Sequence, residues 1–401
     1  MMKKPNYRQT FFSCSLGFVT QAIAANFAPL LFLIFHNTYG ISLGTVALIP
    51  LVFYLTQLLT DLTASKFVDK IGYRICVVVS QIISAMGLAM LAFLPELIPI
   101  PLIGILIAVV FYAMGSGLVE VLVSPILEAC PFENKNGMMS LLHSFYCWGA
   151  VGVIALSTFF FSVFGVANWR ILALIWAAVP LVNVFNFAFC PIGRLVEEGE
   201  GMRIGKLLRM PLFWLLVLLM ICSGAAEASM AQWASAFAES ALGVSKTVGD
   251  LVGPCLFAAF MGISRVIYGK TSQKLDLTKT MMACGILCVA CYLLASLSNM
   301  PILGLVGCAI CGISVGIMWP GTISLSSQKF PVGGTAMFAF LALAGDVGGT
   351  AGPSLVGFLS GLAGGNLKIG LLCATIFPVL LVLGLFVLKR AVKNHQNKNK
   401  L

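Results

Sequence analysis

Three acidic residues stand inside long apolar stretches of this sequence: Glu120, Glu227 and Asp346. Placing an ionisable side chain at the centre of a bilayer costs roughly 2.5–3.5 kcal/mol on insertion scales. Such a side chain usually faces a cavity or a polar partner, where a carboxyl group can take up and release protons. We expect Glu120 and Asp346 to couple to protons and Glu227 to line a binding cavity. The alternative is that they only form structural hydrogen bonds between helices.

His143 stands in the apolar stretch that follows Glu120, at a similar depth from the short turn that joins the two stretches. The two side chains could therefore meet, and a Glu–His pair is a tunable site for a proton. We add His143 to the expected proton-coupling residues. The alternative is a buried histidine that only makes local hydrogen bonds.

Amide, phenol and indole side chains are the other groups available for binding at comparable depth. Amides can bond the hydroxyls of a sugar, and an aromatic plane can cover the C–H face of its ring. No Lys or Arg stands at the middle of an apolar stretch, which favours a neutral or cationic substrate over a carboxylate or phosphate. The indoles could instead pack or face lipid. The expected substrate-binding residues are Gln21, Asn26, Tyr146, Trp148, Glu227, Gln232, Trp233 and Trp319, with Gln57 as a further polar group.

The composition requires a membrane around these residues. Of 401 residues, 60% are hydrophobic and only 9% are charged, and the mean hydropathy is +1.02. A soluble domain carries about a quarter charged residues. The apolar runs are long and unbroken rather than alternating, which favours spanning helices over a closed barrel. The sequence predicts an all-α membrane protein.

The apolar runs divide into about twelve transmembrane helices, since a span needs about 20 residues. A charged stretch at residues 191–210 separates two six-helix bundles, which we expect at 1–190 and 211–389, followed by a basic tail at 390–401. The expected spans are 11–35, 44–67, 75–94, 102–128, 137–163, 169–190, 212–238, 249–269, 280–298, 302–327, 334–362 and 367–388.

Basic residues are distributed unevenly between the two sides of the predicted membrane. With both termini inside, all but three of the 24 Lys and Arg residues fall on the inner side, the exceptions being Arg170, Lys246 and Lys368. This is the positive-inside pattern. It predicts an inner-membrane protein with cytoplasmic termini, and it explains the net charge of +10 without a nucleic-acid partner.

Thirteen cysteines lie mostly within apolar runs, and two CxxC pairs occur, Cys288 with Cys291 and Cys308 with Cys311. Their spacing formally suits zinc or redox chemistry. Because both pairs lie inside apolar spans, we expect them to pack as small apolar side chains. The sequence shows no hydrolase triad, phosphate loop or convincing metal-ligand cluster, so we expect no enzyme, metal or cofactor.

Two corresponding loops reveal an internal repeat. Residues 61–74 read DLTASKFVDKIGYR, and residues 265–276 read RVIYGKTSQKLD at the matching place in the second half. The first loop resembles the cytoplasmic signature G-x-L-x-D-R-x-G-R-R of the major facilitator superfamily. The resemblance implies two facing bundles and a conformational latch at the cytoplasmic face, although a plain positive-inside loop is the alternative. The expected latch residues are Asp61, Asp69, Lys70, Gly72, Arg74 and Arg265.

A finer resemblance covers the fourth and fifth spans. Residues 115–125 (GSGLVEVLVSP) and 141–150 (LLHSFYCWGA) look like the fucose–proton symporter family of sugar permeases. In that family a Glu at the place of Glu120 is implicated in proton coupling. That family also has an Asp in its first helix, whereas residues 21–29 here (QAIAANFAP) contain no acid.

Together these features predict a secondary active transporter that works by alternating access. The first hypothesis is proton-coupled uptake of a neutral sugar or similar small polar solute. The second is proton-driven efflux of a drug or cationic metabolite, with the same acids as counter-charges. A membrane receptor is a third, weaker possibility. The expected partners are a solute, protons and the lipid bilayer, and we expect a monomer.

Overall fold

The structure is a computed structural model and describes residues 6–41, 45, 48–193, 202, 204–242, 251–298, 300–364 and 366–398. Within these ranges the regular structure is helical and contains no strand. Helices suit this composition because hydrocarbon offers no hydrogen-bond partners to the backbone. In a helix the backbone N–H and C=O groups bond one another.

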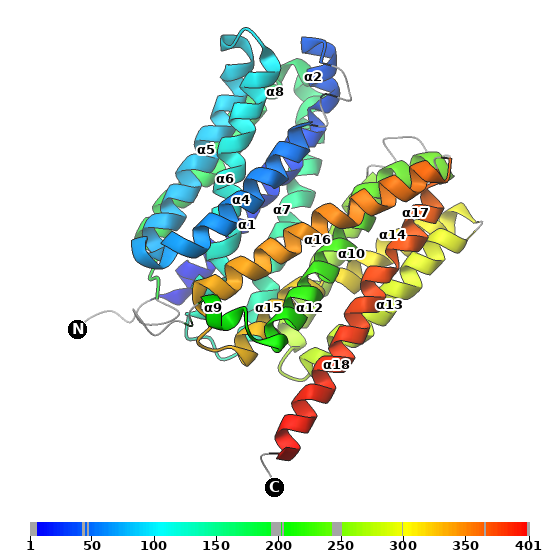
Figure 1. The fold of residues 1–401 in the computed structure, drawn as a ribbon. Helices are drawn as coiled ribbons and strands as arrows, with labels where there is room; N and C mark the ends of the chain where they lie inside the picture. The colour runs from blue at the N-terminus through cyan, green and yellow to red at the C-terminus, as the bar shows by residue number, and fades with distance from the viewer. Residues whose placement is uncertain are drawn as a thin grey trace. The chain divides into compact units, whose positions relative to one another are not determined.

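In the described part of the first half, the chain forms seven helices and one 3-10 turn (Figure 1). Two of the helices, α1 and α2, share the first expected span and are interrupted at Leu31, two residues after Pro29. The elements are α1 (Tyr7–Leu30), α2 (Phe32–Tyr39), α4 (Leu48–Ile71), α5 (Tyr73–Leu97), α6 (Pro101–Glu128), α7 (Lys135–Phe164), η1 (Val166–Asn168) and α8 (Trp169–Phe189).

The second half begins with a short helix and continues with longer ones. Several of its spans are interrupted, and a π-helical turn precedes α12. The elements are α9 (Ile204–Leu207), α10 (Pro211–Leu242), η2 (Leu251–Cys255), α12 (Leu256–Thr271), α13 (Leu277–Leu297), α14 (Pro301–Val315), α15 (Met318–Lys329), α16 (Gly334–Leu362), α17 (Leu367–Ala374) and α18 (Ile376–Lys398).

Each of the twelve expected spans overlaps one of these helices or a consecutive pair of helical elements. Ten helical stretches of the described chain are long and apolar enough to cross a membrane, and Leu48–Ala64 of α4 is a shorter apolar helix. The prediction of an all-α membrane fold is confirmed. Hydropathy missed the interruptions, because a break of one or two residues does not change the average over a span.

The chain packs as two compact units. The first unit comprises Met1–Phe132, Phe145–Glu200 and Gly334–Ala339. The second comprises Glu133–Ser144, Gly201–Gly333 and Phe340–Leu401. The first ten residues of α7 therefore pack with the second unit. The bundle boundaries expected at 190 and 211 remain a prediction.

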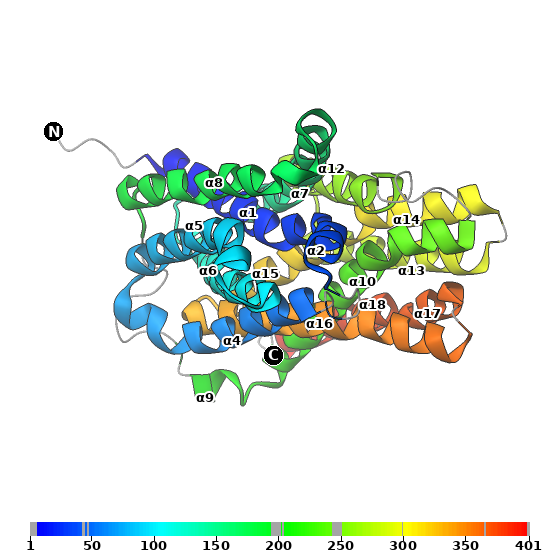
Figure 2. The ribbon, with the colours of Figure 1, turned by 90° about the horizontal axis from the view of Figure 1, so that it is seen from above.

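In the first unit α5 packs against α6 and α8, while α1 and α4 pack against α6 (Figures 1 and 2). Its core contains the fully buried rings of Phe27, Phe35, Tyr112 and Trp169. The rings of Phe35 and Trp169 meet edge to face with their centroids 5.4 Å apart. Close approach of α5 and α6 depends on Gly87, where a side chain would overlap the backbone of Tyr112.

In the second unit α14 packs against α12, α13 and α10, and α18 packs against α10 and α13 (Figure 2). Glycines again allow backbones to meet. A Cβ at Gly312 of α14 would overlap the carbonyl of Phe257 in α12. A Cβ at Gly224 of α10 would likewise overlap the carbonyl of Gly345 in α16. Small residues at such crossings allow close van der Waals packing, which drives helix association in membranes.

Pro320 explains the break between α14 and α15. Proline has no N–H, and its ring clashes with the carbonyl four residues earlier, which here belongs to Gly316. Helix α14 ends at Val315 and α15 begins at Met318. The carbonyl oxygen of Gly316 is consequently free to accept a hydrogen bond from outside its own helix.

We predict that Gly87→Ala destabilises the protein by about 1–3 kcal/mol, since the added methyl group overpacks the α5–α6 contact. Its Cβ would lie 2.9 Å from the carbonyl oxygen of Ala108 as well as against Tyr112. The measurement is the melting temperature in mild detergent. Gly152→Ala is the matched control, because its Cβ would meet nothing within 4 Å. Equal melting temperatures for the two variants would contradict the packing argument.

Candidate functional site

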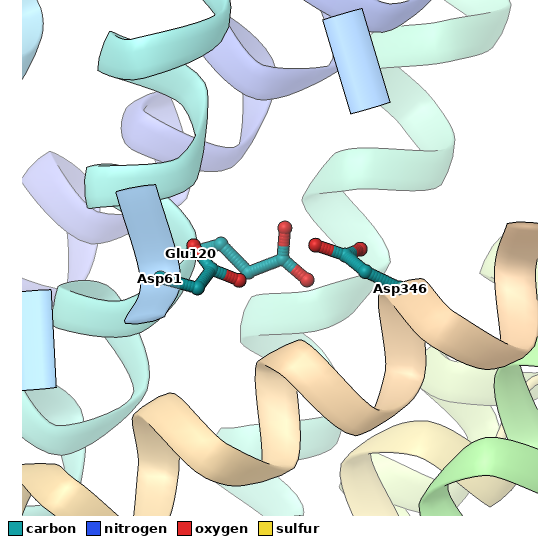
Figure 3. Close-up of side chains that lie close together, drawn as sticks. All are labelled: Asp61, Glu120 and Asp346. Atoms are coloured by element: carbon teal, nitrogen blue, oxygen red, sulfur yellow. The ribbon is translucent and has the colours of Figure 1, made fainter. Parts of the chain in front are cut away.

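Two carboxyl groups meet inside the first unit. Asp61 comes from α4 and is fully buried, and Glu120 comes from α6 and is partly buried. Carboxylate oxygens of the two residues lie within 4.8 Å of each other (Figure 3). We call Asp61, Glu120 and the amides described next the carboxylate cluster. The third residue labelled in Figure 3, Asp346, belongs to α16 in the second unit and is 8% exposed.

Two amides hold Glu120 in place. Nε2 of Gln21, on α1, donates to Oε2 of Glu120 at 2.6 Å. Nε2 of Gln57, on α4, donates to the same oxygen. The hydroxyl of Ser116 donates to Oε1 of Gln57 at 3.4 Å, which orients that amide. Three helices thus converge on one carboxylate, which amide donors stabilise in its charged form.

Gly117 makes room for Asp61. A Cβ at this position would lie 3.0 Å from Oδ1 of Asp61 and 3.2 Å from the backbone oxygen of Gln57. Gly117 lies three residues before Glu120 on α6, so one turn of this helix supplies both the acid and the space beside it. A larger residue would push the two carboxyl groups out of their present arrangement.

Two carboxylates this close repel each other when both are ionised, so the pair can share one proton. That is the chemistry of a proton carrier. Carboxylate oxygens are also ligands of hard cations, but such ions take six or more oxygens. The carboxylate cluster can therefore hold a proton, and its oxygens are also of the type that hard cations bind together with water.

A second polar cluster surrounds Arg265 in the second unit. This side chain lies within α12 and is 2% exposed. Its Nε donates to the freed carbonyl of Gly316 at 2.7 Å, and its Nη1 donates to the carbonyl of His143 at 2.9 Å. Its Nη2 bonds Oε2 of Glu227 on α10 at 3.2 Å. We call these four residues the arginine cluster.

The arginine cluster adds to what the sequence showed. We expected no cation at the middle of an apolar span and assigned Arg265 to a latch near the cytoplasmic end of the span 249–269; the structure places it within α12 and buries it beside a carboxylate. Glu227 was expected to line a cavity, and it is 18% exposed beside Arg265. The role of Arg265 as a latch residue and the role of Glu227 in substrate binding remain predictions.

The arginine cluster also seats the beginning of α7. The hydroxyl of Ser140 donates to the carbonyl of Arg265 at 2.8 Å. One turn earlier, Gly137 and Gly269 face each other, and a Cβ on Gly137 would overlap the carbonyl of Gly269. Asn134 accepts from Ser272 at 2.9 Å. Hydrogen bonds at both ends hold the beginning of α7 against α12. We call this contact, made by Asn134, Gly137 and Ser140 with Arg265, Gly269 and Ser272, the α7 seat.

His143 takes part through its backbone. It lies in the second unit and is 5% exposed, and its carbonyl accepts from Arg265. Glu120 lies in the first unit. The expected Glu120–His143 pair remains a prediction, as does the role of Asp346 in proton coupling.

Several expected substrate-binding side chains make structural contacts. Nδ2 of Asn26 donates to the carbonyl of Ala22 in its own helix at 2.9 Å. Nε1 of Trp233 donates to the carbonyl of Pro353 at 2.9 Å. The ring of Trp319 fills the space beside Gly345, which precedes Asp346. These contacts hold the three side chains in place, and their role in binding remains a prediction.

The remaining expected binding residues lie at less buried positions. Trp148 is 39% exposed, Tyr146 is partly exposed, and Gln232 is exposed. Gln21 instead lies in the carboxylate cluster. A binding role for these residues remains a prediction.

The expected latch residues of the first half fall in different places. Arg74 donates to the carbonyls of Phe187, Ala188 and Cys190 at 3.0, 2.6 and 2.8 Å, so it caps the end of α8. Gly72 has φ of 100°, a left-handed conformation that favours glycine. Lys70 is exposed, and the side chain of Asp69 lies outside the described residues. Asp61 lies in the carboxylate cluster.

The sequence profile of the Major Facilitator Superfamily matches residues 13–353 and 242–401. The chain belongs to the Major Facilitator Superfamily. It is therefore a multi-pass membrane transporter and not an enzyme. A comparison with curated protein sequences returned no match.

Solved structures of several transporters share this fold. The E. coli fucose:proton symporter FucP has a TM-score of 0.78 at 16% identity, over 94% of this chain and 98% of that chain. The proton:xylose symporter XylE has a TM-score of 0.83 at 11% identity, over 94% and 95% of the two chains. The human organic anion transporter MFSD10 has a TM-score of 0.76 at 14% identity, over 95% and 100%. At these identities the likeness concerns the fold alone.

Sequence reasoning missed the contact between Asp61 and Glu120. The signal that was present is the position of Asp61 within an apolar span, like that of Glu120. It was masked because Asp61 also begins the signature-like stretch at residues 61–74. Arg265, at the equivalent place in the repeat, was interpreted as part of a loop for the same reason.

We predict that Glu227→Gln lowers the free energy of unfolding by about 3–5 kcal/mol, because the buried guanidinium of Arg265 loses its carboxylate. The measurement is denaturant or thermal unfolding in mild detergent. Glu96→Gln is the matched control, since Glu96 pairs with Arg170 at an exposed site, where a pair contributes less than about 1 kcal/mol.

Adding Arg265→Met to Glu227→Gln should recover part of the lost stability, because no buried charge then lacks a counter-charge. Equal losses in the Glu227 and Glu96 variants would show that the arginine cluster does not depend on charge pairing.

Proposed function

We propose that this transporter takes up a neutral sugar or a similar small polar solute together with protons, by alternating access. The observation that carries the proposal is the carboxylate cluster: two carboxyl groups from α4 and α6, within 4.8 Å of each other inside a membrane-spanning bundle. The fold is shared with two proton-coupled sugar symporters, which also supports proton-coupled uptake of a sugar.

In this scheme Asp61 and Glu120 share the transported proton. Gln21 and Gln57 both donate to Glu120 and so hold its carboxylate in place beside Asp61. One shared proton removes one of the two negative charges and with it the repulsion between them. It therefore favours whichever conformation of the bundle keeps the cluster away from water.

The solute would be held by amides and aromatic rings. Asn26, Tyr146 and Trp148 supply hydrogen-bonding groups and aromatic faces from the first half, and Gln232, Trp233 and Trp319 supply them from the second. A neutral solute fits this set because its hydroxyls need many weak hydrogen bonds rather than a counter-charge. Glu227 accepts from Arg265 and would reach the solute only through its exposed edge.

The α7 seat would be the element that changes during transport. Helix α7 begins in the second unit and continues in the first. A change in the bonds that Arg265 makes to His143 and Glu227 would therefore be transmitted along a continuous helix. Asp346 and His143 are proposed to assist proton coupling, and Lys70 and Arg74 to stabilise the cytoplasmic ends of the helices.

The proposal includes a location and an orientation. The distribution of Lys and Arg supports the inner membrane with both termini in the cytoplasm. We also propose that the protein acts as a monomer.

Proton-driven efflux of a drug or cationic metabolite is the alternative. The carboxylate cluster also supports it, because a buried carboxylate can serve as the counter-charge of a cation. The two functions differ in what the cluster binds: a proton that travels with the solute, or one that is exchanged for it.

We predict that Asp61→Asn and Glu120→Gln each abolish proton-driven accumulation of radiolabelled hexose in proteoliposomes. With an inward gradient of one pH unit, one-to-one coupling can concentrate a solute about tenfold, since about 1.4 kcal/mol corresponds to a factor of ten. Each variant should reach only the external concentration. Glu133→Gln is the matched control, because this acid is exposed.

Accumulation that survives in the doubly neutralised protein would contradict the proposed proton site. Expulsion of a cationic dye without any hexose uptake would favour the efflux function instead. Exchange of unlabelled for labelled hexose without a gradient distinguishes the two parts of the proposal, because it should persist in the variants if only coupling is lost.

A further inference from the structure

Four cysteines from the two CxxC pairs are buried in one helix pair of the second unit. Cys288 and Cys291 lie on α13, and Cys308 and Cys311 lie on α14. Each exposes 3% or less of its surface. Because α13 packs directly against α14, two motifs that are separate in sequence face each other within the bundle.

One pair of thiols from different helices is in contact. The Sγ atoms of Cys288 and Cys311 lie 3.9 Å apart, although the residues are 23 positions apart in sequence. Gly307 allows this approach, because a Cβ there would lie 3.0 Å from the carbonyl oxygen of Cys291. Ser314 donates to the backbone of Cys311 at 2.6 Å and lies 3.7 Å from its sulfur.

We propose that Cys288 and Cys311 form an oxidisable dithiol site, which a membrane-permeant hydroperoxide converts into a disulfide that joins α13 to α14. A disulfide requires a sulfur–sulfur distance of about 2.05 Å. The Sγ atoms of Cys288 and Cys311, at 3.9 Å, have about 2 Å to close, the difference between that distance and the bond length. The proposal does not depend on the transported solute or on the coupling ion.

The oxidation balances as two steps. One thiol loses its proton and the thiolate attacks a peroxide oxygen, so the O–O bond breaks and a sulfenic acid forms. The leaving alkoxide or hydroxide takes up that proton and departs as an alcohol or water. The second thiol then displaces the hydroxyl group from the sulfenic sulfur, the S–S bond forms, and water leaves. Two S–H bonds are lost, the two sulfurs give up two electrons, and the peroxide takes them.

The surroundings favour a disulfide over a bound soft metal ion. Dithiol and disulfide are both uncharged, so neither needs a counter-charge in an apolar bundle. A bridging metal ion would require both thiols to ionise first. Burial also makes the reaction slow compared with that of an exposed thiol, so the site responds to sustained rather than brief oxidation.

The bond would close a loop that contains the turn between α13 and α14. Such a cross-link lowers the conformational entropy of the unfolded chain, so the oxidised protein should have a higher melting temperature. The lone exposed thiol of Cys373 offers a contrast within the same unit, because it can be oxidised without forming this link.

The experiment treats the purified full-length protein in lipid nanodiscs with hydrogen peroxide, followed by denaturation and maleimide labelling of the remaining thiols. We expect the thiols of Cys288 and Cys311 to become protected, apart from any oxidation of the exposed Cys373. Peptides containing Cys288 and Cys311 should be joined with the loss of two hydrogen atoms. A thiol reductant should reverse both changes. The melting temperature should rise on oxidation.

Matched variants come from the same two motifs. Cys288→Ser and Cys311→Ser should abolish both the joined peptide and the rise in melting temperature, whereas Cys291→Ser and Cys308→Ser should retain them. A bond within one helix, a bond between Cys291 and Cys308, or full labelling of both thiols in the oxidised wild type would overturn the proposal. So would protection that appears only when a soft metal ion is added.

Discussion

A charged side chain inside a membrane span must find its hydrogen bonds within the protein, because hydrocarbon supplies none. This constraint organises both polar clusters of the transporter. Glu120 receives two amides from neighbouring helices, and Arg265 is bonded to two backbone carbonyls and to Glu227. Each charged side chain thereby connects several helices, and a change in its charge alters the hydrogen bonds to each of these helices.

The clusters occur where helices depart from regularity. Pro320 interrupts one span and frees the carbonyl of Gly316, to which Arg265 donates. Gly117 leaves the space that Asp61 occupies, and Gly137 and Gly269 allow α7 to meet α12. Proline therefore leaves a carbonyl acceptor unbonded within the helix, and glycine leaves space beside the backbone for a neighbouring group. The polar clusters therefore depend on the N–H that proline lacks and on the side chains that glycines lack, as well as on the charged residues.

The internal repeat places opposite charges at equivalent positions. Asp61 of the first half corresponds to Arg265 of the second, and both are buried. In the first unit the position meets another acid, which suits a shared proton. In the second it meets Glu227, which neutralises it. Equivalent positions of the repeat thus have two electrostatic roles. From the sequence both were interpreted as parts of cytoplasmic loops, because the signature-like stretches begin there.

The sequence by itself determined the fold class and most spans, because hydropathy is a sum over neighbouring residues: the span expected at 102–128 is α6 at Pro101–Glu128. It also marked Glu120 as a costly residue in need of partners. Only the tertiary structure decided that those partners are Gln21, Gln57 and Asp61. Which side chains meet depends on how each helix is rotated about its axis and where close packing is allowed. Those are properties of several helices together, and no single stretch of sequence contains them.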